Sequence, residues 1–278
     1  MSLTVARYVT KAMERIAPLS LAEKWDNVGL LLESPVPPPQ SNAHKILLTI
    51  DLTTQVANEA LALPASCIIA YHPILFKPLS SITLANPLQA SLLRCAAAGI
   101  SVYCPHTSLD SVHGGINDWL ASGLGKGDVQ LIGEDREGKG GAGRIVRLHE
   151  GITLAQLQER IKAHLGLQHL QVAMSPEYPR QVVQSVAICA GSGGSMLLGI
   201  DADVYFTGEM SHHEVLAAVA AGKNVVLCGH TNTERGYLPV LASKLNAEFA
   251  KADGEELRIA QQATVHVSTQ DRHPLAVV

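Results

Sequence analysis

The chain has 278 residues, enough for one large domain or two modest ones, and 47% of them are hydrophobic, which excludes an intrinsically disordered protein. No apolar run reaches the roughly 18–20 residues that a membrane helix needs, so we expect no membrane partner. The net charge is −4 and aromatic residues make up 4%, so the chain offers neither a basic surface nor a base-stacking platform for nucleic acid.

The chain has five cysteines, and because the number is odd and no C-x-x-C pair occurs, they predict buried thiols in a reducing compartment. We therefore expect a cytoplasmic protein, with a mitochondrial or nuclear location as alternatives. Arg7 and Lys11 precede the first acidic residue, Glu14, as in a mitochondrial presequence. Apolar residues recur at helical spacing from Ala6 to Ile16, however, which favours an amphipathic first helix of the fold.

Short apolar runs alternate with helix-like runs through most of the chain. The predicted strands span residues 45–50, 67–71, 100–104, 186–189, 204–207 and 225–228. The predicted helices span residues 53–63, 87–98, 116–123, 154–165, 214–221 and 235–249. The strands are apolar almost throughout, as in sheets covered on both faces, so this alternation predicts an α/β fold.

Two irregular segments interrupt this pattern. Residues 34–42 form a Pro-rich stretch that predicts a surface loop, and residues 123–143 are rich in glycine and charge, which is typical of a linker. We therefore predict a first domain over residues 1–127, a second over 128–222 and a return to the first over 223–278. No tandem repeat of fixed period is visible.

Polar side chains follow the ends of several predicted strands. They are Asp51, Tyr71-His72, His106 to Asp110, Glu209 with His212 and His213, and His230 with Glu234. In open α/β sheets, ligands bind beyond the carboxyl ends of the strands, and parallel strands bring those ends together. The sequence therefore predicts a ligand site there, built from residues far apart in the chain.

The chemistry of these residues suits divalent metal ions such as Zn, Fe, Mn or Ni, because imidazoles and carboxylates bind all of them. Our candidate ligands are His72, Asp110, His230 and Glu234. They could hold one ion, or two if a carboxylate bridges, and such a pair can activate water for hydrolysis. His213 and His106 are the candidate proton shuttles.

Each candidate residue also has a purely structural interpretation. His72 could bond to the backbone at a strand end, and Asp110 could form an Asx turn or cap a helix. The His230–Glu234 pair could be a hydrogen bond at a helix entry, and His213 could lie at a solvated helix start.

In chain order, these clusters resemble the Nif-three-like family, whose bacterial members are often labelled GTP cyclohydrolase 1 type 2. The matching stretches are residues 17–32, 71–76, 105–110, 114–121, 207–216 and 229–238. The Tyr-His-Pro and GHTNTERG sequences are similar to those of the eukaryotic branch.

The resemblance implies two interlinked α/β domains with a Nif-three-like fold, a toroidal hexamer formed as a trimer of dimers, and two metals at the carboxyl ends of strands. It implies Asp110 as a ligand of the first metal, His72 and His230 as ligands of the second, and Glu234 as the bridge. Bacterial members have His-His-Pro where this chain has Tyr71-His72-Pro73, so the first metal would keep Asp110 and Glu234 with water, Tyr71 or a nearby imidazole.

The sequence is compatible with two candidate functions. The first is a metal-dependent hydrolase of a small phosphate- or nucleotide-like substrate, although nothing in these residues selects GTP. The second is a non-enzymatic metal-binding or scaffold protein that interacts with transcription-related partners, as the name of eukaryotic relatives implies. The absence of a histidine at Tyr71 favours the second.

Overall fold

The computed structural model describes residues 3–37, 43–136, 138–176 and 182–278, and their contacts form two units. Unit 1 holds Met1–Leu109 and Tyr237–Arg272, and unit 2 holds Asp110–Gly236 and His273–Val278. The chain therefore enters unit 2, returns to unit 1 and ends in unit 2. The predicted domain boundaries at residues 127 and 222 both fall inside unit 2 of this division.

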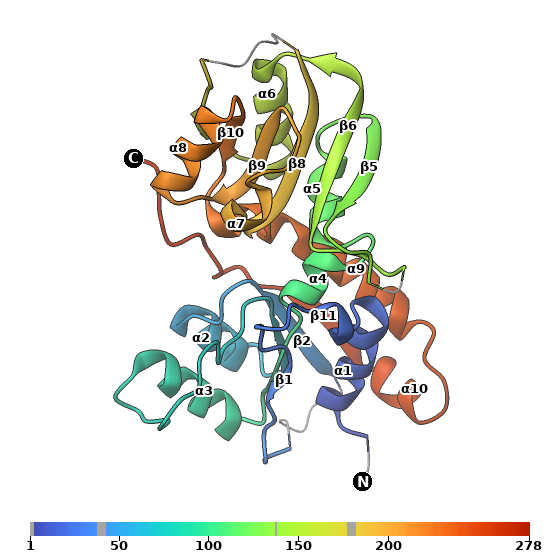
Figure 1. Cartoon of the computed structure of the whole chain (residues 1–278). Helices are drawn as coiled ribbons and strands as arrows, with labels where there is room; N and C mark the ends of the chain where they lie inside the picture. Colours follow the sequence, from blue (N-terminus) through green and yellow to red (C-terminus); the bar gives the residue numbers. More distant parts are fainter. Residues whose placement is uncertain (1–2, 38–42, 137, 177–181) are drawn as a thin grey trace. The chain divides into compact units, whose positions relative to one another are not determined.

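Unit 1 is a five-stranded sheet with helices on both faces (Figure 1). Its strands, in sheet order, are β1 (Gly29–Leu32), β4 (Ser101–Cys104), β3 (Ala65–Ala70), β2 (His44–Thr49) and β11 (Ala263–Val267). Only the edge strand β1 runs antiparallel to its neighbour. The carboxyl ends of β2, β3 and β4 therefore lie along the same edge of the sheet, as a strand-end site requires.

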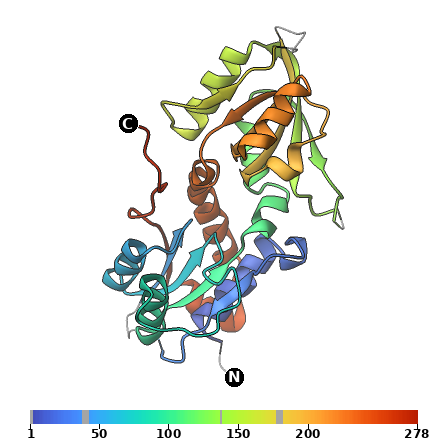
Figure 2. The ribbon, with the colours of Figure 1, turned by 60° about the vertical axis from the view of Figure 1, so that its left-hand side comes forward.

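The helices of unit 1 cover the two faces of its sheet in separate groups. On one face α2 (Thr54–Ala62) packs with α3 (Pro87–Ala97), and a core that includes Leu47, Val56 and Ile68 fills the interface. On the other face lie α1 (Val5–Ile16), α9 (Leu238–Phe249) and α10 (Gly254–Ala260) (Figure 2). The sheet is thus buried on both sides, which explains why its strands are apolar almost throughout.

Unit 2 is a six-stranded mixed sheet. Its strands, in sheet order, are β5 (Gly127–Ile132), β6 (Gly143–Ile152), β8 (Val183–Ser192), β9 (Val204–Glu209), β10 (Asn224–Leu227) and β7 (Gln171–Ala173). The central strands β8, β9 and β10 are parallel, and the others are antiparallel to their neighbours. Helices α7 (Gly194–Leu197) and α8 (His212–Ala220) cover one face, while α5 (Ile116–Ser122) and α6 (Leu154–Leu165) pack together on the other.

The predicted α/β fold is confirmed, and each predicted strand and helix corresponds to an observed element. The predicted linker instead contains β5 and the turn into β6. The elements that the sequence did not predict include β1, β5, β6, β7, β11, α4 (Thr107–Ser111) and α10. Of the predicted loop at 34–42, residues 38–42 lie outside the described residues.

All five cysteines are buried and free, as predicted. In the part of the chain that the structure describes, no helix is both long and apolar enough to cross a membrane.

Candidate metal centre

In unit 2, His230 and Glu234 lie directly after β10, on the short helix η2 (His230–Thr233) and at its end. Their nearest donor atoms, His230 Nε2 and Glu234 Oε1, are 3.3 Å apart, and the Glu234 side chain is only 1% exposed. Two donor atoms at this spacing can both lie within bonding distance of one divalent ion, because metal–ligand bonds are about 2 Å long. The pair is therefore spaced to chelate one metal ion.

Gly191, near the end of β8, leaves open the space that both donor atoms face. A Cβ at this position would lie 2.7 Å from Glu234 Oε1 and 2.8 Å from His230 Nε2. The Gly191 N–H donates to Thr233 Oγ1 over 2.9 Å, and its carbonyl accepts a hydrogen bond from Thr207 Oγ1 over 3.1 Å. The backbone is thus held on both sides, so a side chain here could not move away from the donor atoms.

Replacing Gly191 by Ala should weaken metal binding by at least about tenfold, because the methyl group would lie against both donor atoms. Isothermal titration with Mn²⁺ measures the loss. Gly166→Ala is the matched control, since Gly166 has a similar φ of 67° but open space around its Cβ position. Both variants share the backbone cost of about 1–2 kcal/mol for a left-handed alanine. Equal metal affinities in the two variants would show that the space beside Gly191 is not the ion's.

The second ring nitrogen of His230 also has a carboxylate partner. His230 Nδ1 lies 2.8 Å from Oε1 of Glu209, the last residue of β9. Burial lowers the pKa of His230, but the hydrogen bonds and charges of Glu234 and Glu209 raise it overall, to about 9. The field of these two carboxylates that stabilises a proton on the ring would likewise stabilise a divalent cation beside it.

In unit 1, His72 follows β3 and has the same kind of partner. Its Nδ1 lies 2.9 Å from Oδ1 of Asp51, which follows the neighbouring parallel strand β2. The ring also contacts those of Tyr71 and His106, with centroids 4.9 and 5.5 Å away. As in His230, the carboxylate at Nδ1 leaves Nε2 as the atom that can bind an ion.

Asp110, at the start of unit 2, lies near the same end of β8. Burial, then the charge of Asp110 and then that of Glu234, raise the pKa of the Cys189 thiol, so both carboxylates act on this residue of β8. The Asn117 amide donates to the Asp110 carbonyl over 3.3 Å, and its oxygen accepts from the Ala190 N–H over 2.9 Å. Asn117 therefore ties the backbone of Asp110 to the residue before Gly191.

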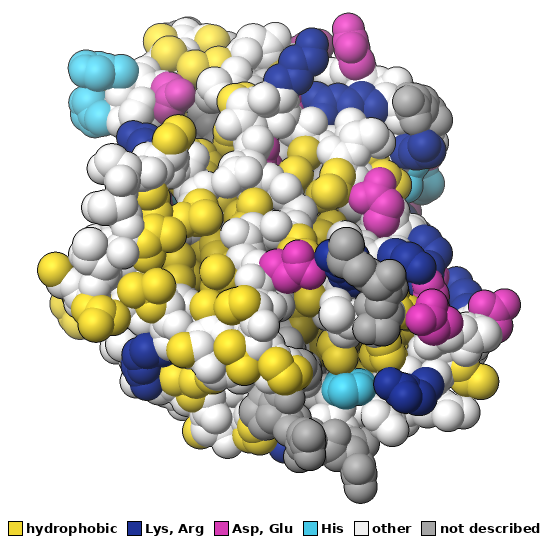
Figure 3. Space-filling model, turned by 90° about the horizontal axis from the view of Figure 1, so that it is seen from below, with side chains coloured by type: hydrophobic (Ala, Val, Ile, Leu, Met, Phe, Trp, Pro, Cys, Tyr) yellow, Lys and Arg dark blue, Asp and Glu magenta, His cyan; other side chains and the backbone are white. Residues whose placement is uncertain are grey.

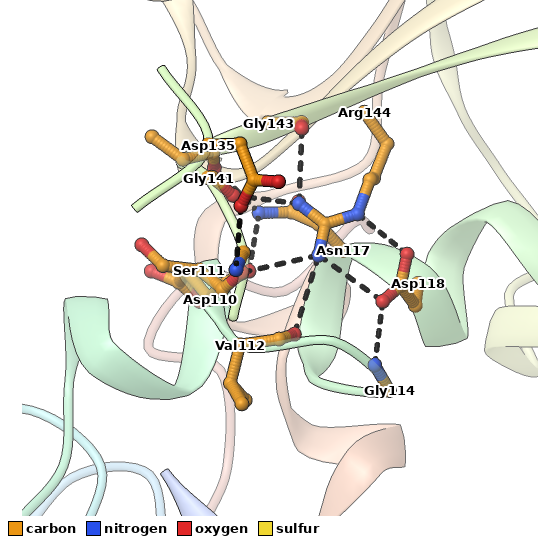
Figure 4. Close-up of polar contacts among 12 residues, drawn as sticks. Asp110, Ser111, Val112, Gly114, Asn117, Asp118, Asp135, Gly141, Gly143 and Arg144 are labelled. Atoms are coloured by element: carbon orange, nitrogen blue, oxygen red, sulfur yellow. Dashed lines mark hydrogen bonds and ion pairs between the residues drawn. The ribbon is translucent and has the colours of Figure 1, made fainter. Parts of the chain in front are cut away.

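Arg144, a fully buried residue of β6, holds the segment that follows Asp110 (Figure 4). Its guanidinium donates to both carboxylate oxygens of Asp118, over 2.5 and 3.1 Å. It also donates to the carbonyls of Ser111, Val112, Gly141 and Gly143. Because all these acceptors surround one planar cation, the loop after Asp110 and the start of β6 are fixed to each other.

His106 of unit 1 is bonded to a carboxylate shielded from solvent. Its Nδ1 lies 2.7 Å from Asp26 Oδ1, while Asp26 Oδ2 accepts from the Thr107 N–H and hydroxyl over 3.1 and 2.5 Å. His106 adopts a φ of 33°, which is rare for a residue other than glycine. Burial raises the pKa of Asp26, but the bonds from His106 and Thr107 lower it by more, so it is depressed overall.

Asp26→Asn should lower the free energy of unfolding at pH 7 by about 1–3 kcal/mol, the value of hydrogen bonds to a charged group. Because the folded-state pKa is depressed, this contribution is present above about pH 4 and is lost as the pH falls through the folded-state pKa. Urea unfolding at a series of pH values should therefore show a difference that shrinks towards pH 2. A difference that is constant with pH would contradict the charge-based explanation.

Exposed hydrophobic side chains surround a groove of unit 1 beside His106. Trp25 and Phe76 are 63% and 54% exposed, and the centroids of their rings lie 5.9 and 6.2 Å from that of His106. The groove between Trp25 and residues 75–82 has a volume of about 560 Å³ and carries the cation Lys77. Leu79, Ile82, Leu84 and Leu88 are also exposed nearby in the chain. Seen from below, the molecule carries many hydrophobic side chains on its surface (Figure 3).

The structure places the other candidate shuttle, His213, in the exposed first turn of α8. Its ring lies against that of His212, with centroids 5.4 Å apart. Ser211 caps this helix and forms a capping box with Glu214, which accounts for the local polar sequence. A role of His213 in proton transfer stays a prediction.

Among the described residues of unit 2, the imidazole of His230 and the carboxylate of Glu234 form a donor pair that could hold a metal ion. The roles of His72 of unit 1 and of Asp110 as further ligands stay predictions. Asp51 and Glu209 lie at predicted strand ends, but the sequence predicted no role for either of them. Their equal spacing could have indicated one, since each precedes its histidine by 21 residues.

The family model, the relatives and the solved structure that this chain matches all carry the name NIF3 or NGG1-interacting factor 3. A family model described as Duf34/NIF3 (NGG1p interacting factor 3) matches residues 4–265. The chain is 45% identical to "Protein NIF3 homolog" of Schizosaccharomyces pombe, over 99% of this chain and 98% of that one. It is 39% identical to "NGG1-interacting factor 3" of Saccharomyces cerevisiae, over 83% and 86%. The structure of a Bacillus cereus protein related to NIF3 aligns with a TM-score of 0.81 at 21% identity, covering 98% and 99%, which shows a shared fold.

Proposed function

Because this chain belongs to the Duf34/NIF3 family, as its motifs predicted, we propose that it binds one or two divalent metal ions at the carboxyl ends of its strands. The proposed ligands are His72, Asp110, His230 and Glu234. The observation that carries the proposal is the spacing of 3.3 Å between His230 Nε2 and Glu234 Oε1, with the open space beside Gly191 facing both atoms. Imidazole and carboxylate donors suit Zn, Fe, Mn or Ni.

The proposed reaction is hydrolysis of a small phosphate- or nucleotide-like substrate. A bound divalent ion would supply Lewis-acid chemistry and an activated water for such a reaction. Asp26 holds His106 through Nδ1, so Nε2 of this ring is the atom that would accept or return a proton. Trp25 and Phe76 offer aromatic faces for a planar group, and Lys77 offers a cation for a phosphate.

Elemental analysis of freshly purified protein, combined with anomalous scattering from its crystals, tests the metal proposal directly. We expect at least one ion per chain, with His230 and Glu234 among its ligands. Protein reloaded with Mn, Zn, Fe or Ni is then assayed against phosphomonoesters, phosphodiesters and nucleotides, and we expect metal-dependent turnover. A bound metal without turnover across this panel would refute the hydrolase but not the metal site.

A second candidate function is a non-enzymatic scaffold with a protein partner. The relative from budding yeast is named NGG1-interacting factor 3, and the exposed hydrophobic side chains from Phe76 to Leu88 offer a surface for such a partner. On this hypothesis, Glu234→Ala should leave partner binding unchanged. A toroidal hexamer remains a further prediction, which light scattering coupled to size-exclusion chromatography measures.

A further inference from the structure

Each unit contains the same arrangement of a carboxylate and an imidazole. Asp51 and His72 follow the adjacent parallel strands β2 and β3, and Glu209 and His230 stand at the ends of the adjacent parallel strands β9 and β10. Both pairs are separated by 21 residues, and both are joined through Nδ1, over 2.9 and 2.8 Å. A β-α-β segment of the same design therefore delivers each histidine.

The two segments correspond residue by residue. A single shift of 158 residues (from 54 to 212) carries the nine residues of α2 onto the nine residues of α8. The same shift carries the N-cap Thr53 onto the N-cap Ser211, whose side chains accept a backbone N–H three residues on. It also carries the buried Thr49 onto the buried Thr207. Because no insertion breaks this match, Asp51 and Glu209 occupy equivalent positions.

We infer that Asp51 and Glu209 are equivalent positioning residues, each of which fixes one imidazole so that Nε2 carries the lone pair for the metal. The inference rests on the proposed metal site. A carboxylate at Nδ1 keeps the proton on that nitrogen, sets the orientation of the ring and makes Nε2 more basic. Neither carboxylate needs to touch the ion for this role.

Because both carboxylates are partly exposed, a role in positioning the histidines can be distinguished from a role in folding stability. The side chains of Asp51 and Glu209 are 35% and 55% exposed. Ion pairs this exposed contribute little to folding stability, because solvent screens them. Removing either carboxylate should therefore change metal affinity while leaving the unfolding of the metal-free protein almost unchanged.

The experiment measures Mn²⁺ affinity of the full-length protein for Asp51→Ala, Glu209→Ala and the double variant. Loss of such a histidine partner weakens binding by roughly 10–100-fold, so we expect a similar loss from each single variant. The two losses should multiply in the double variant, since each acts through a different histidine. Asp51→Glu should restore part of the affinity. The control is Asp201→Ala, which removes a fully exposed carboxylate of unit 2 that pairs with Lys223. Wild-type affinity in either single variant would overturn the inference.

A measurement without metal separates this inference from the proposed function. At a pH where the ring is neutral, ¹⁵N NMR of the metal-free protein should show His72 with the proton on Nδ1. In Asp51→Ala, this ring should shift towards the Nε2–H tautomer that free imidazole side chains favour. An Nε2–H tautomer of His72 in the wild type would overturn the inference. Failure of the wild type to bind Mn²⁺, with the Nδ1–H tautomer of His72 present, would refute the proposed function and leave the positioning intact.

Discussion

Replacing Glu234 by Gln should weaken divalent-metal binding by about 100-fold or more, or about 2.7 kcal/mol. Glu234 is the most buried of the proposed ligands, and its Oε1 lies 3.3 Å from His230 Nε2. The amide has the same shape as the carboxylate, so packing is preserved, but it lacks the negative charge that a divalent cation requires. A charged ligand lost from a buried site is not replaced by solvent, which is why the expected effect is large.

Isothermal titration with Mn²⁺ and elemental analysis of the purified variant measure this loss. Glu150→Gln is the control, because Glu150 is an exposed residue of β6 in the same unit. Any metal-dependent turnover that the wild type shows should disappear with the bound ion. Glu234→Gln protein with wild-type affinity and stoichiometry would exclude Glu234 as a ligand, and with it the proposed centre.

The strands that the sequence predicted well share one property, which is burial on both faces of a sheet. The strand at residues 65–70 is buried at every position, and its residues 67–70 form an unbroken apolar run that is easy to recognise. The edge strand β7, by contrast, has three residues, none of them fully buried. Such a strand is defined by its hydrogen bonds to β10, for which a single sequence holds no local pattern.

The glycines of residues 123–143 explain why this segment was wrongly predicted to be a linker. Residues 123–143 predict a linker by composition, yet Gly127 and Gly143 lie in strands. A Cβ at Gly127 would lie 2.6 Å from the Arg147 carbonyl oxygen, and one at Gly143 would lie 3.0 Å from that of Ile188. These glycines permit close approach of neighbouring strands rather than chain flexibility. Composition alone cannot distinguish the two uses.

Some contacts of the candidate site could be predicted from the sequence, and others could not. His230 and Glu234 are four residues apart, so their contact is local and the sequence predicts it. The partners of the histidines lie 21 residues away, and they become evident once the strand pairing is known. Asn117 and Arg144 carry no motif of their own, because their acceptors are mostly backbone carbonyls, which every residue possesses. Only the structure could reveal them.

Replacing Arg144 by Met should destabilise the protein by about 3–5 kcal/mol, the second large effect that we expect. The variant would leave the Asp118 carboxylate without its guanidinium partner and several carbonyls of the buried segment without a donor. Arg144→Lys should still cost about 2 kcal/mol, because an ammonium has three donors and cannot bond both oxygens of Asp118 in the planar geometry of a guanidinium. The charge alone is therefore not sufficient.

Urea unfolding of the metal-free protein measures both losses, with Arg147→Lys as the matched control on the exposed side of the same strand. Since Arg144 and Asp118 form one bidentate pair, a double-mutant cycle with Asp118→Asn should give a coupling energy of at least about 1–3 kcal/mol. The Lys variant should also bind metal more weakly than Arg147→Lys, because the segment after Asp110 loses its fixed position. An Arg144→Lys protein with wild-type stability would show that the backbone and not this cation holds the segment.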